Sequence, residues 1–224
     1  MTAPGTIGIP CSPLVDSKFL VGFLLMEKPA DTAMMVLSGE GVAYQRNAIA
    51  QNFQGDWLLF MDSDMIPAPD ALTRLLARGD LDIVHAVCSR RTPPYGYCTW
   101  DVDGKELARP IRRHGLVEAA GCGMAFTLIR RRVFDAIPFP WFEVGKGEDS
   151  TALYEDLWFC RKARAKGFRI WADLGATVWH LTQHAVAPGP DGFPQVIAAA
   201  ETMPQIRQED AHATEQSPEP AIAS

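Results

Sequence analysis

A buried strand that ends in two closely spaced carboxylates is the feature that most constrains this sequence. Residues 57–61 (WLLFM) form an unbroken apolar run of strand length, which is typical of a strand buried on both faces of a parallel sheet. Asp62 and Asp64 follow at once, with Ser63 between them. Because side chains at i and i+2 of an extended chain point the same way, we expect both carboxylates at the carboxyl edge of the sheet, where α/β proteins bind ligands.

This pair of aspartates permits two interpretations. As oxygen ligands they suit a hard divalent cation that also holds phosphate oxygens. Alternatively, they serve only the solvated turn that follows a strand, where aspartate is a common residue. The Asp-x-Asp spacing does not decide between these interpretations, so the rest of the chain has to be considered.

The order of the expected elements predicts an α/β fold. Strands and helices alternate in close succession, which is the pattern of a mainly parallel central sheet flanked by helices. The expected elements are strands near 6–10, 34–37, 57–61 and 81–87, and helices over 17–28, 42–53 and from residue 67. We therefore predict a single Rossmann-like domain over residues 1–186.

Composition and charge set the limits of that domain. The chain has 224 residues, 47% of them hydrophobic and 21% charged, which is ordinary for one globular domain. From Ala187 onward, acidic residues outnumber the single basic residue, Arg207, and Pro, Ala and Gln dominate without apolar periodicity. We predict that residues 187–224 are a disordered acidic tail.

The cysteines and the apolar segments bear on the compartment. The five cysteines are scattered and contain no Cys-x-x-Cys, which argues against a disulfide framework or a zinc ribbon and favours a reducing compartment. The first residues lack the basic region of a secretory signal. The apolar segment 19–26 is too short to span a bilayer. We expect a cytoplasmic protein without stable membrane insertion.

Further features of the sequence contain side chains that could act in catalysis or in ligand binding. Glu155 and Asp156 begin an expected helix, either as a charge-complemented N-terminus or as functional acids. Arg46 lies within an earlier helix, as part of a solvated face or as a cation for phosphates. His180 follows the last expected strand, and lone histidines are usually structural. Gly121 and Gly123 flank a small residue in a strand expected over 118–129, which suggests the close approach of a ligand or of another backbone.

These features occur in an order that resembles the family 2-type glycosyltransferases, which have the nucleotide-diphosphosugar-binding GT-A fold. The resemblance runs from about Ile7 to Leu181. It rests on Ile7-Gly8-Ile9-Pro10, Arg46-Asn47, Asp62-Ser63-Asp64, Gly121 with Gly123, the Glu155-Asp156 helix that ends in Lys166-Gly167, and His180.

The resemblance implies a donor site that contains a metal ion. Asp62, Asp64 and His180 would hold Mn²⁺ or Mg²⁺ on the diphosphate of a nucleotide-diphosphate sugar. The residues implied to bind this donor are Pro10, Ser38, Arg46, Asp62, Ser63 and Asp64.

The resemblance also implies the chemistry. Asp156 corresponds to the general base, which deprotonates the acceptor hydroxyl for in-line attack at the anomeric carbon with inversion. Glu155 would orient Asp156 or contact the acceptor. The acid that usually follows the second strand and often recognises the base is not clearly present, since Ser38 or Glu40 stands there, so the identity of the nucleotide stays open. The short chain favours the transfer of a single sugar by a hexosyltransferase-like enzyme over processive synthesis.

Two alternatives to this function remain at the level of sequence. A sugar-nucleotide pyrophosphorylase or nucleotidyltransferase shares the fold class, but its Gly-rich, Arg-containing N-terminal loop is missing here. A catalytically inactive nucleotide-sugar-binding scaffold is the other alternative. The acceptor stays open among a sugar, a lipid, a protein and a modified DNA base, and the sequence does not determine the oligomeric state.

Overall fold

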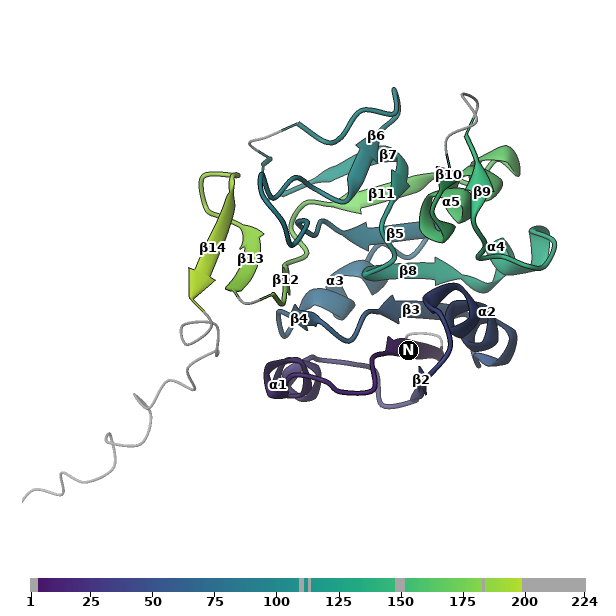
Figure 1. The fold of residues 1–224 in the computed structure, drawn as a ribbon. Coiled ribbons are helices and arrows are strands. Elements are labelled where there is room, and N and C mark those ends of the chain that lie inside the picture. The colour runs from purple at the N-terminus through teal and green to yellow at the C-terminus, as the bar shows by residue number, and fades with distance from the viewer. Residues whose placement is uncertain (1–3, 109–110, 113, 148–151, 183, 199–224) are drawn as a thin grey trace, which may run out of the picture.

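The computed structural model describes residues 4–198 except 109–110, 113, 148–151 and 183. Its centre is an eight-stranded sheet that crosses the molecule (Figure 1). The strands, in spatial order, are β2 (Thr32–Ser38), β1 (Gly5–Cys11), β3 (Trp57–Met61), β8 (Phe126–Arg130), β5 (Ile83–Ala86), β11 (Ile170–Asp173), β7 (Leu116–Cys122) and β6 (Thr99–Asp101).

The predicted α/β fold is confirmed, and the sheet is mixed. β1 pairs in parallel with β2 and with β3, and β11 pairs in parallel with β5. β8 lies between β3 and β5 and is antiparallel to both. The single strand expected over 118–129 is wrong, because the chain leaves β7 at Gly123 and returns as β8. This turn lies at the carboxyl edge of β3, since the Ala125 carbonyl accepts the Asp62 N–H at 2.9 Å.

Helices cover both faces of the sheet. On one face, α1 (Ser17–Leu25) and α3 (Ala71–Leu76) pack on the sheet through Phe19, Phe23, Leu72 and Leu75. On the other face lie α2 (Val42–Asn52), α4 (Arg131–Ala136) and α5 (Glu155–Ala165). α1 begins where the Asp16 carboxylate accepts the Lys18 N–H at 2.8 Å, as expected of an N-cap.

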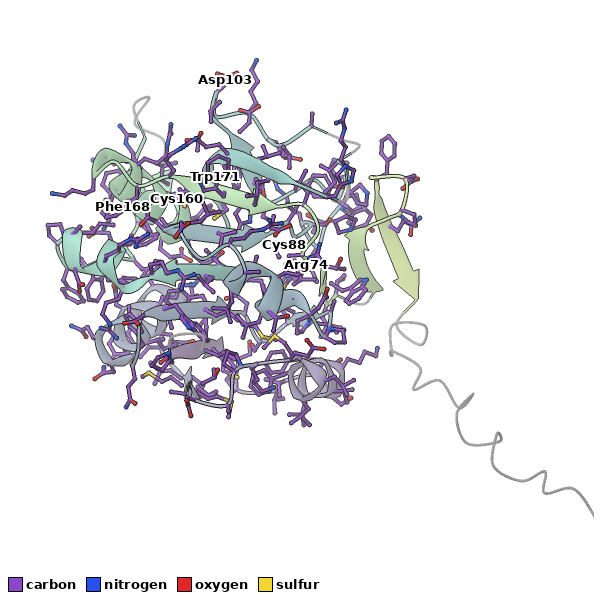
Figure 2. All side chains as sticks on the ribbon, turned by 180° about the vertical axis from the view of Figure 1, so that it is seen from behind. Arg74, Cys88, Asp103, Cys160, Phe168 and Trp171 are labelled. Carbon is purple, nitrogen blue, oxygen red and sulfur yellow. The ribbon has the colours of Figure 1, made fainter. Side chains whose placement is uncertain are left out.

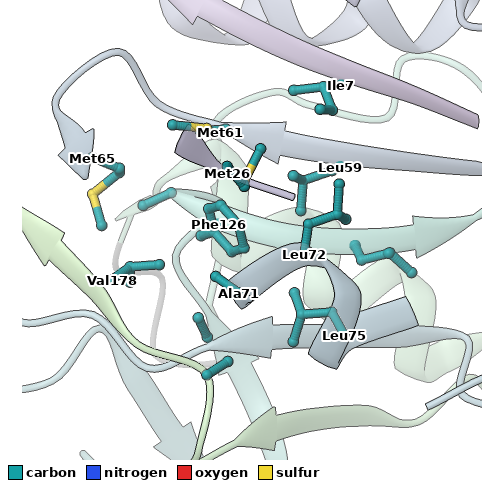
Figure 3. Packing of buried hydrophobic residues seen from close by; sticks show 14 of the residues in the cluster. Ile7, Met26, Leu59, Met61, Met65, Ala71, Leu72, Leu75, Phe126 and Val178 are labelled. Carbon is teal, nitrogen blue, oxygen red and sulfur yellow. The ribbon is translucent and has the colours of Figure 1, made fainter. Parts of the chain in front are cut away.

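The central strand β3 is buried on both faces, as its sequence predicts. All five of its residues are fully buried. Leu59 and Met61 pack with Ile7, Leu72 and Phe126 beneath α1 and α3 (Figure 3), whereas Leu58 and Phe60 face α2 and α5. Each such aliphatic or aromatic side chain stabilises the fold by about 1.5–3 kcal/mol relative to exposure, so the strand that leads to Asp62 is rigidly held.

Two smaller sheets complete the described chain. One consists of β14 (Pro194–Ala198), β13 (His184–Pro188), β12 (Val178–His180) and β4 (Met65–Pro67), in that spatial order. The other pairs β9 (Gly145–Lys146) with β10 (Ala152–Leu153). Within the described part of the chain, none of the helices has the length and apolar character needed to cross a bilayer.

The hairpin of β13 and β14 extends past residue 186, where the sequence predicts the domain to end. Residues 187–198, expected to be disordered, form the end of β13, the turn and the second strand of this hairpin. The Gly192 carbonyl accepts hydrogen bonds from the Tyr97 hydroxyl at 2.7 Å and from the Ile111 N–H at 3.0 Å. The hairpin is therefore attached to the body of the fold, and the remaining tail, 199–224, lies outside the described residues.

A pair of truncations tests this attachment. Ending the chain after Val186 should lower the melting temperature, because the buried Tyr97 hydroxyl loses the Gly192 carbonyl. Such a loss costs about 1–3 kcal/mol, or roughly 2–4 °C per kcal/mol in a chain of this size. Ending the chain after Ala198 should leave the melting temperature unchanged in differential scanning fluorimetry. Equal melting temperatures for the two truncations would contradict the attachment.

Candidate active site

The site lies at the carboxyl edge of β1 and β3, where two cavities adjoin. The first cavity has a volume of about 320 Å³ and the second about 280 Å³, and both are lined by Val42 and Asp62. The first is completed by the residues after β1, by the turn after β2 and by Ser63 and Asp64. The second is completed by Cys88, Cys98, Trp100, the Gly123 turn, Glu155, Asp156 and His180.

Arg46 links Asp62, which lines both cavities, to Glu155, which lines the second. It projects from α2 and is almost fully buried. Its Nη2 donates to both carboxylate oxygens of Asp62, at 2.9 and 3.1 Å, and its Nη1 donates to Glu155. A buried guanidinium held by two carboxylates is a fixed structural element, because removal of any partner leaves an uncompensated buried charge. Arg46 is thus neither a solvated residue nor, in this arrangement, directed at a phosphate.

Asp64 has different partners from Asp62. Its Oδ2 lies 3.0 Å from Arg91 Nη1 and 3.3 Å from His180 Nε2. Burial alone would raise the pKa of Asp64, but the hydrogen bond and charge of His180, together with Arg91, lower it below the ordinary value. The other oxygen, Oδ1, is buried and has no hydrogen-bond partner. Asp64 is therefore ionised and keeps one oxygen available for a ligand.

His180 comes to this point from β12, far along the chain. Its Nδ1 donates to the Ser89 carbonyl at 2.8 Å, and its Nε2 lies 3.3 Å from Asp64 Oδ2. Burial lowers the pKa of His180, but the hydrogen bond and charge of Asp64 outweigh burial and raise the pKa above its ordinary value. His180 is thus oriented by a backbone carbonyl, in the way that metal-binding histidines usually are.

Asp156 lies on the far side of the second cavity. Burial, and then the charge of Glu155, raise the pKa of Asp156 to about 6, although Arg46 opposes the shift. Its Oδ1 accepts the N–H of Leu157 at the start of α5. A carboxylate that titrates near neutral pH at the wall of a cavity has the properties of a general base.

The two glycines singled out in the sequence make room for this helix start. A Cβ at Gly121 would lie 2.9 Å from Leu157 Cδ2, and one at Gly123 would lie 3.3 Å from Cys98 Cβ and 3.7 Å from Asp156 Oδ2. The expected close approach at these glycines is therefore that of α5 and of the chain before β6. Gly123 leaves the Asp156 carboxylate open to the cavity.

Most of the site residues predicted from the sequence are gathered at this edge. Pro10, Ser63 and both aspartates line the first cavity, and Glu155, Asp156 and His180 line the second. Ser38 ends β2 but does not line either cavity, where its neighbours Gly39 and Glu40 stand instead. No group of three His, Cys, Asp or Glu side chains in the described chain is arranged to hold a metal ion, because Asp62 turns toward Arg46.

Sequence reasoning missed several lining residues. Ser12 and Pro13 follow β1 and were available from the rule that strand ends meet at one edge. The Ser12 N–H donates to Ser63 Oγ at 3.1 Å, which links the two strand ends. Cys88 and Cys98 carried no local signal, since their proximity depends on how a long loop closes.

Comparison with known proteins bears on the fold and on the family of the middle part of the chain. Residues 32–137, from β2 to the end of α4, match the model of glycosyl transferase family 2. A197 from STIV has a similar fold, with a TM-score of 0.57 and 22% identity over 86% of this chain and 93% of that chain. GalNAc-T7, crystallised with UDP, GalNAc and Mn²⁺, has a TM-score of 0.49 and 15% identity over 66% of this chain and 32% of that chain. No curated protein sequence matches significantly.

Residues 32–137 are thus similar to family 2 glycosyltransferases, and the mixed α/β fold is consistent with the GT-A fold. The resemblance recognised in the sequence is confirmed at this level.

Proposed function

We propose that this glycosyltransferase transfers a single sugar from a nucleotide-diphosphate sugar to an acceptor hydroxyl, with inversion and with the help of a divalent cation. The observation that carries the proposal is the position of Asp156. Its carboxylate, with a pKa of about 6, lies in a cavity that adjoins the cavity lined by Asp62 and Asp64. A donor in the first cavity and an acceptor in the second would meet at Asp62.

The protein would supply some of the ligands of a divalent cation, and the donor would supply others. Asp64 Oδ1 is buried without a partner, and His180 presents Nε2 to the same carboxylate. Two protein ligands leave the remaining positions to diphosphate oxygens and water, as is common for ions that act on phosphates. The histidine nitrogen favours Mn²⁺ over the harder Mg²⁺. When bound, the cation would neutralise charge on the departing nucleoside diphosphate.

Asp156 supplies the proton chemistry in this proposal. Its ionised carboxylate accepts the proton of the acceptor hydroxyl while the hydroxyl oxygen forms a bond to the anomeric carbon. The bond between that carbon and the phosphate oxygen breaks on the opposite face, which inverts the configuration. Arg46 fixes Asp62 on the donor side and Glu155 beside the base, so the two halves of the site keep their spacing.

The proposal is tested by binding and turnover together. Sugar nucleotides should raise the melting temperature with Mn²⁺ but much less with EDTA, since a ligand at 100 times its Kd stabilises by about 2.7 kcal/mol. The best donor should then release free nucleoside diphosphate, with the sugar on water or on an added acceptor. Binding without turnover would indicate the inactive scaffold, and formation of a nucleoside triphosphate from pyrophosphate would indicate the pyrophosphorylase.

The pH profile should report Asp156. Because the base must be ionised, kcat/KM should be constant well above pH 6 and fall about tenfold per pH unit below the pKa of about 6. Assays with saturating Mn²⁺ over about pH 4.5–8 would measure this profile. The residual activity of Asp156→Asn should not show this fall in kcat/KM below pH 6. A wild-type profile that stays flat below pH 5 would exclude Asp156 as the base.

A further inference from the structure

A pair of thiols faces each other across the base of the loop formed by residues 89–97. Ser89 and Tyr97 form an antiparallel bridge, and the Cys98 N–H donates to the Cys88 carbonyl at 2.9 Å. Cys88 and Cys98 are therefore opposite each other in an antiparallel pairing, where Cα atoms are about 4.5–5.5 Å apart. This separation lies within the range of about 4.4–6.8 Å that a disulfide bridges.

Cys88 and Cys98 are both free thiols, at opposite positions of the two paired segments. Both residues line the second cavity. Cys88 is only 3% exposed, whereas Cys98 is half-buried. A small reagent that enters the cavity therefore meets Cys98 first. The neighbouring Cys88 side chain also lowers the pKa of Cys98, which favours the reactive thiolate.

We propose that Cys88 and Cys98 are an oxidation site, at which a peroxide converts the two thiols into a disulfide that clasps the base of the 89–97 loop. The Cys98 sulfur attacks one peroxide oxygen, the O–O bond breaks, and water leaves behind a sulfenic acid on Cys98. The Cys88 sulfur then displaces that hydroxyl, which forms the S–S bond and a second water. The two thiols supply the two electrons that reduce the peroxide.

The position of the clasp connects it to the glycosyltransferase site. Within the loop, the Ser89 carbonyl orients His180, and Arg91 pairs with Asp64. A covalent bond at the base of the loop restricts the movement of both contacts. The oxidation itself does not depend on the proposed sugar transfer, so it can be tested without a substrate.

The chain contains a matched control pair. Cys122 and Cys160 are also close to each other, since the Cys160 thiol donates to the Cys122 carbonyl at 3.7 Å, but both are fully buried between β7 and α5. Figure 2 shows Cys88 and Cys160 well apart in the fold. Proximity of two cysteines is thus shared by the two pairs, and access from a cavity is what distinguishes Cys88 and Cys98.

Hydrogen peroxide treatment of the full chain, followed by denaturation and alkylation, tests the proposal. The free thiols should fall from five to three because two are consumed, with a mass loss of about 2 Da. Trypsin should yield the peptides 79–90 and 92–105 joined to each other, since each contains only one of the two cysteines. Dithiothreitol should reverse the change, and oxidation should raise the melting temperature by about 5 °C.

Cysteine-to-serine variants identify the two cysteines that form the disulfide. Cys88→Ser and Cys98→Ser should each abolish the joined peptides, whereas Cys11→Ser, which alters a cysteine of the first cavity, should retain them. Five thiols that persist after oxidation would overturn the proposal. So would a linkage of Cys122 to Cys160 in place of Cys88 to Cys98, or a Cys98 that ends as a sulfinic acid without joined peptides.

Discussion

Asp156→Asn should reduce the rate of sugar transfer by about 10²–10⁴-fold, because an amide keeps the size of the carboxylate but cannot accept the acceptor's proton. The affinity for the donor should stay within a few-fold of wild type, since Asp156 lines the second cavity and not the first. Single-turnover transfer with saturating donor measures the chemical step, and calorimetric titration of the donor with Mn²⁺ measures binding.

Two further variants show whether the loss of rate is specific to Asp156. Asp135→Asn alters an exposed carboxylate on α4, away from both cavities, and should leave the rate unchanged. Glu155→Gln removes a charge that pairs with Arg46, so it should act more mildly than Asp156→Asn and through the placement of the helix start. Wild-type transfer by Asp156→Asn would show that another group is the base, and equal losses in both α5 variants would point to a structural role.

The parts of the site that could be predicted are those encoded in a few adjacent residues. The run 57–61 predicts β3 because five consecutive apolar residues are typical of a strand buried on both faces. Asp62 and Asp64 then follow from the strand end, and Glu155 with Asp156 follows from the start of α5. In each case the local pattern determines the local structure, and the fold needs only to bring strand ends to one edge.

The parts that could not be predicted depend on contacts between distant segments. From the neighbouring sequence, Arg46 is expected only to lie on one face of a helix. Its position between Asp62 and Glu155 follows from the packing of α2 and α5 on the sheet. In the same way, no local pattern reveals that β8 inserts antiparallel beside β3. Pairing of this kind is decided by the whole topology.

The hairpin of β13 and β14 was missed for another reason. Its turn contains Asp191-Gly192, a dipeptide typical of tight turns, with Gly192 at a φ of 79°. The acidic, proline-rich composition of the segment outweighed this signal in the sequence interpretation. The strands are held by pairing with each other and by β12, so average composition was the weaker guide.

Asp64→Asn and His180→Ala should each weaken Mn²⁺-dependent donor binding by more than about 100-fold. Loss of a residue that only supports a metal ligand typically costs 10–100-fold in affinity, and these residues are proposed as the ligands themselves. Calorimetric titration of the donor with Mn²⁺, repeated with EDTA, measures the metal-dependent part. The weak binding that remains in EDTA should be the same in wild type and variants.

Controls separate a lost ligand from a damaged fold. His114→Ala alters an exposed histidine outside both cavities and should bind donor and Mn²⁺ normally. The far-ultraviolet circular dichroism of His180→Ala should match wild type, because the strand pairing of β12 with β4 is made by the backbone. If His180→Ala kept its Mn²⁺-dependent affinity, the cation would have to be held by Asp62 and Asp64 instead. Asp62 would then have to leave Arg46, and the buried guanidinium would keep only Glu155 as a counter-charge.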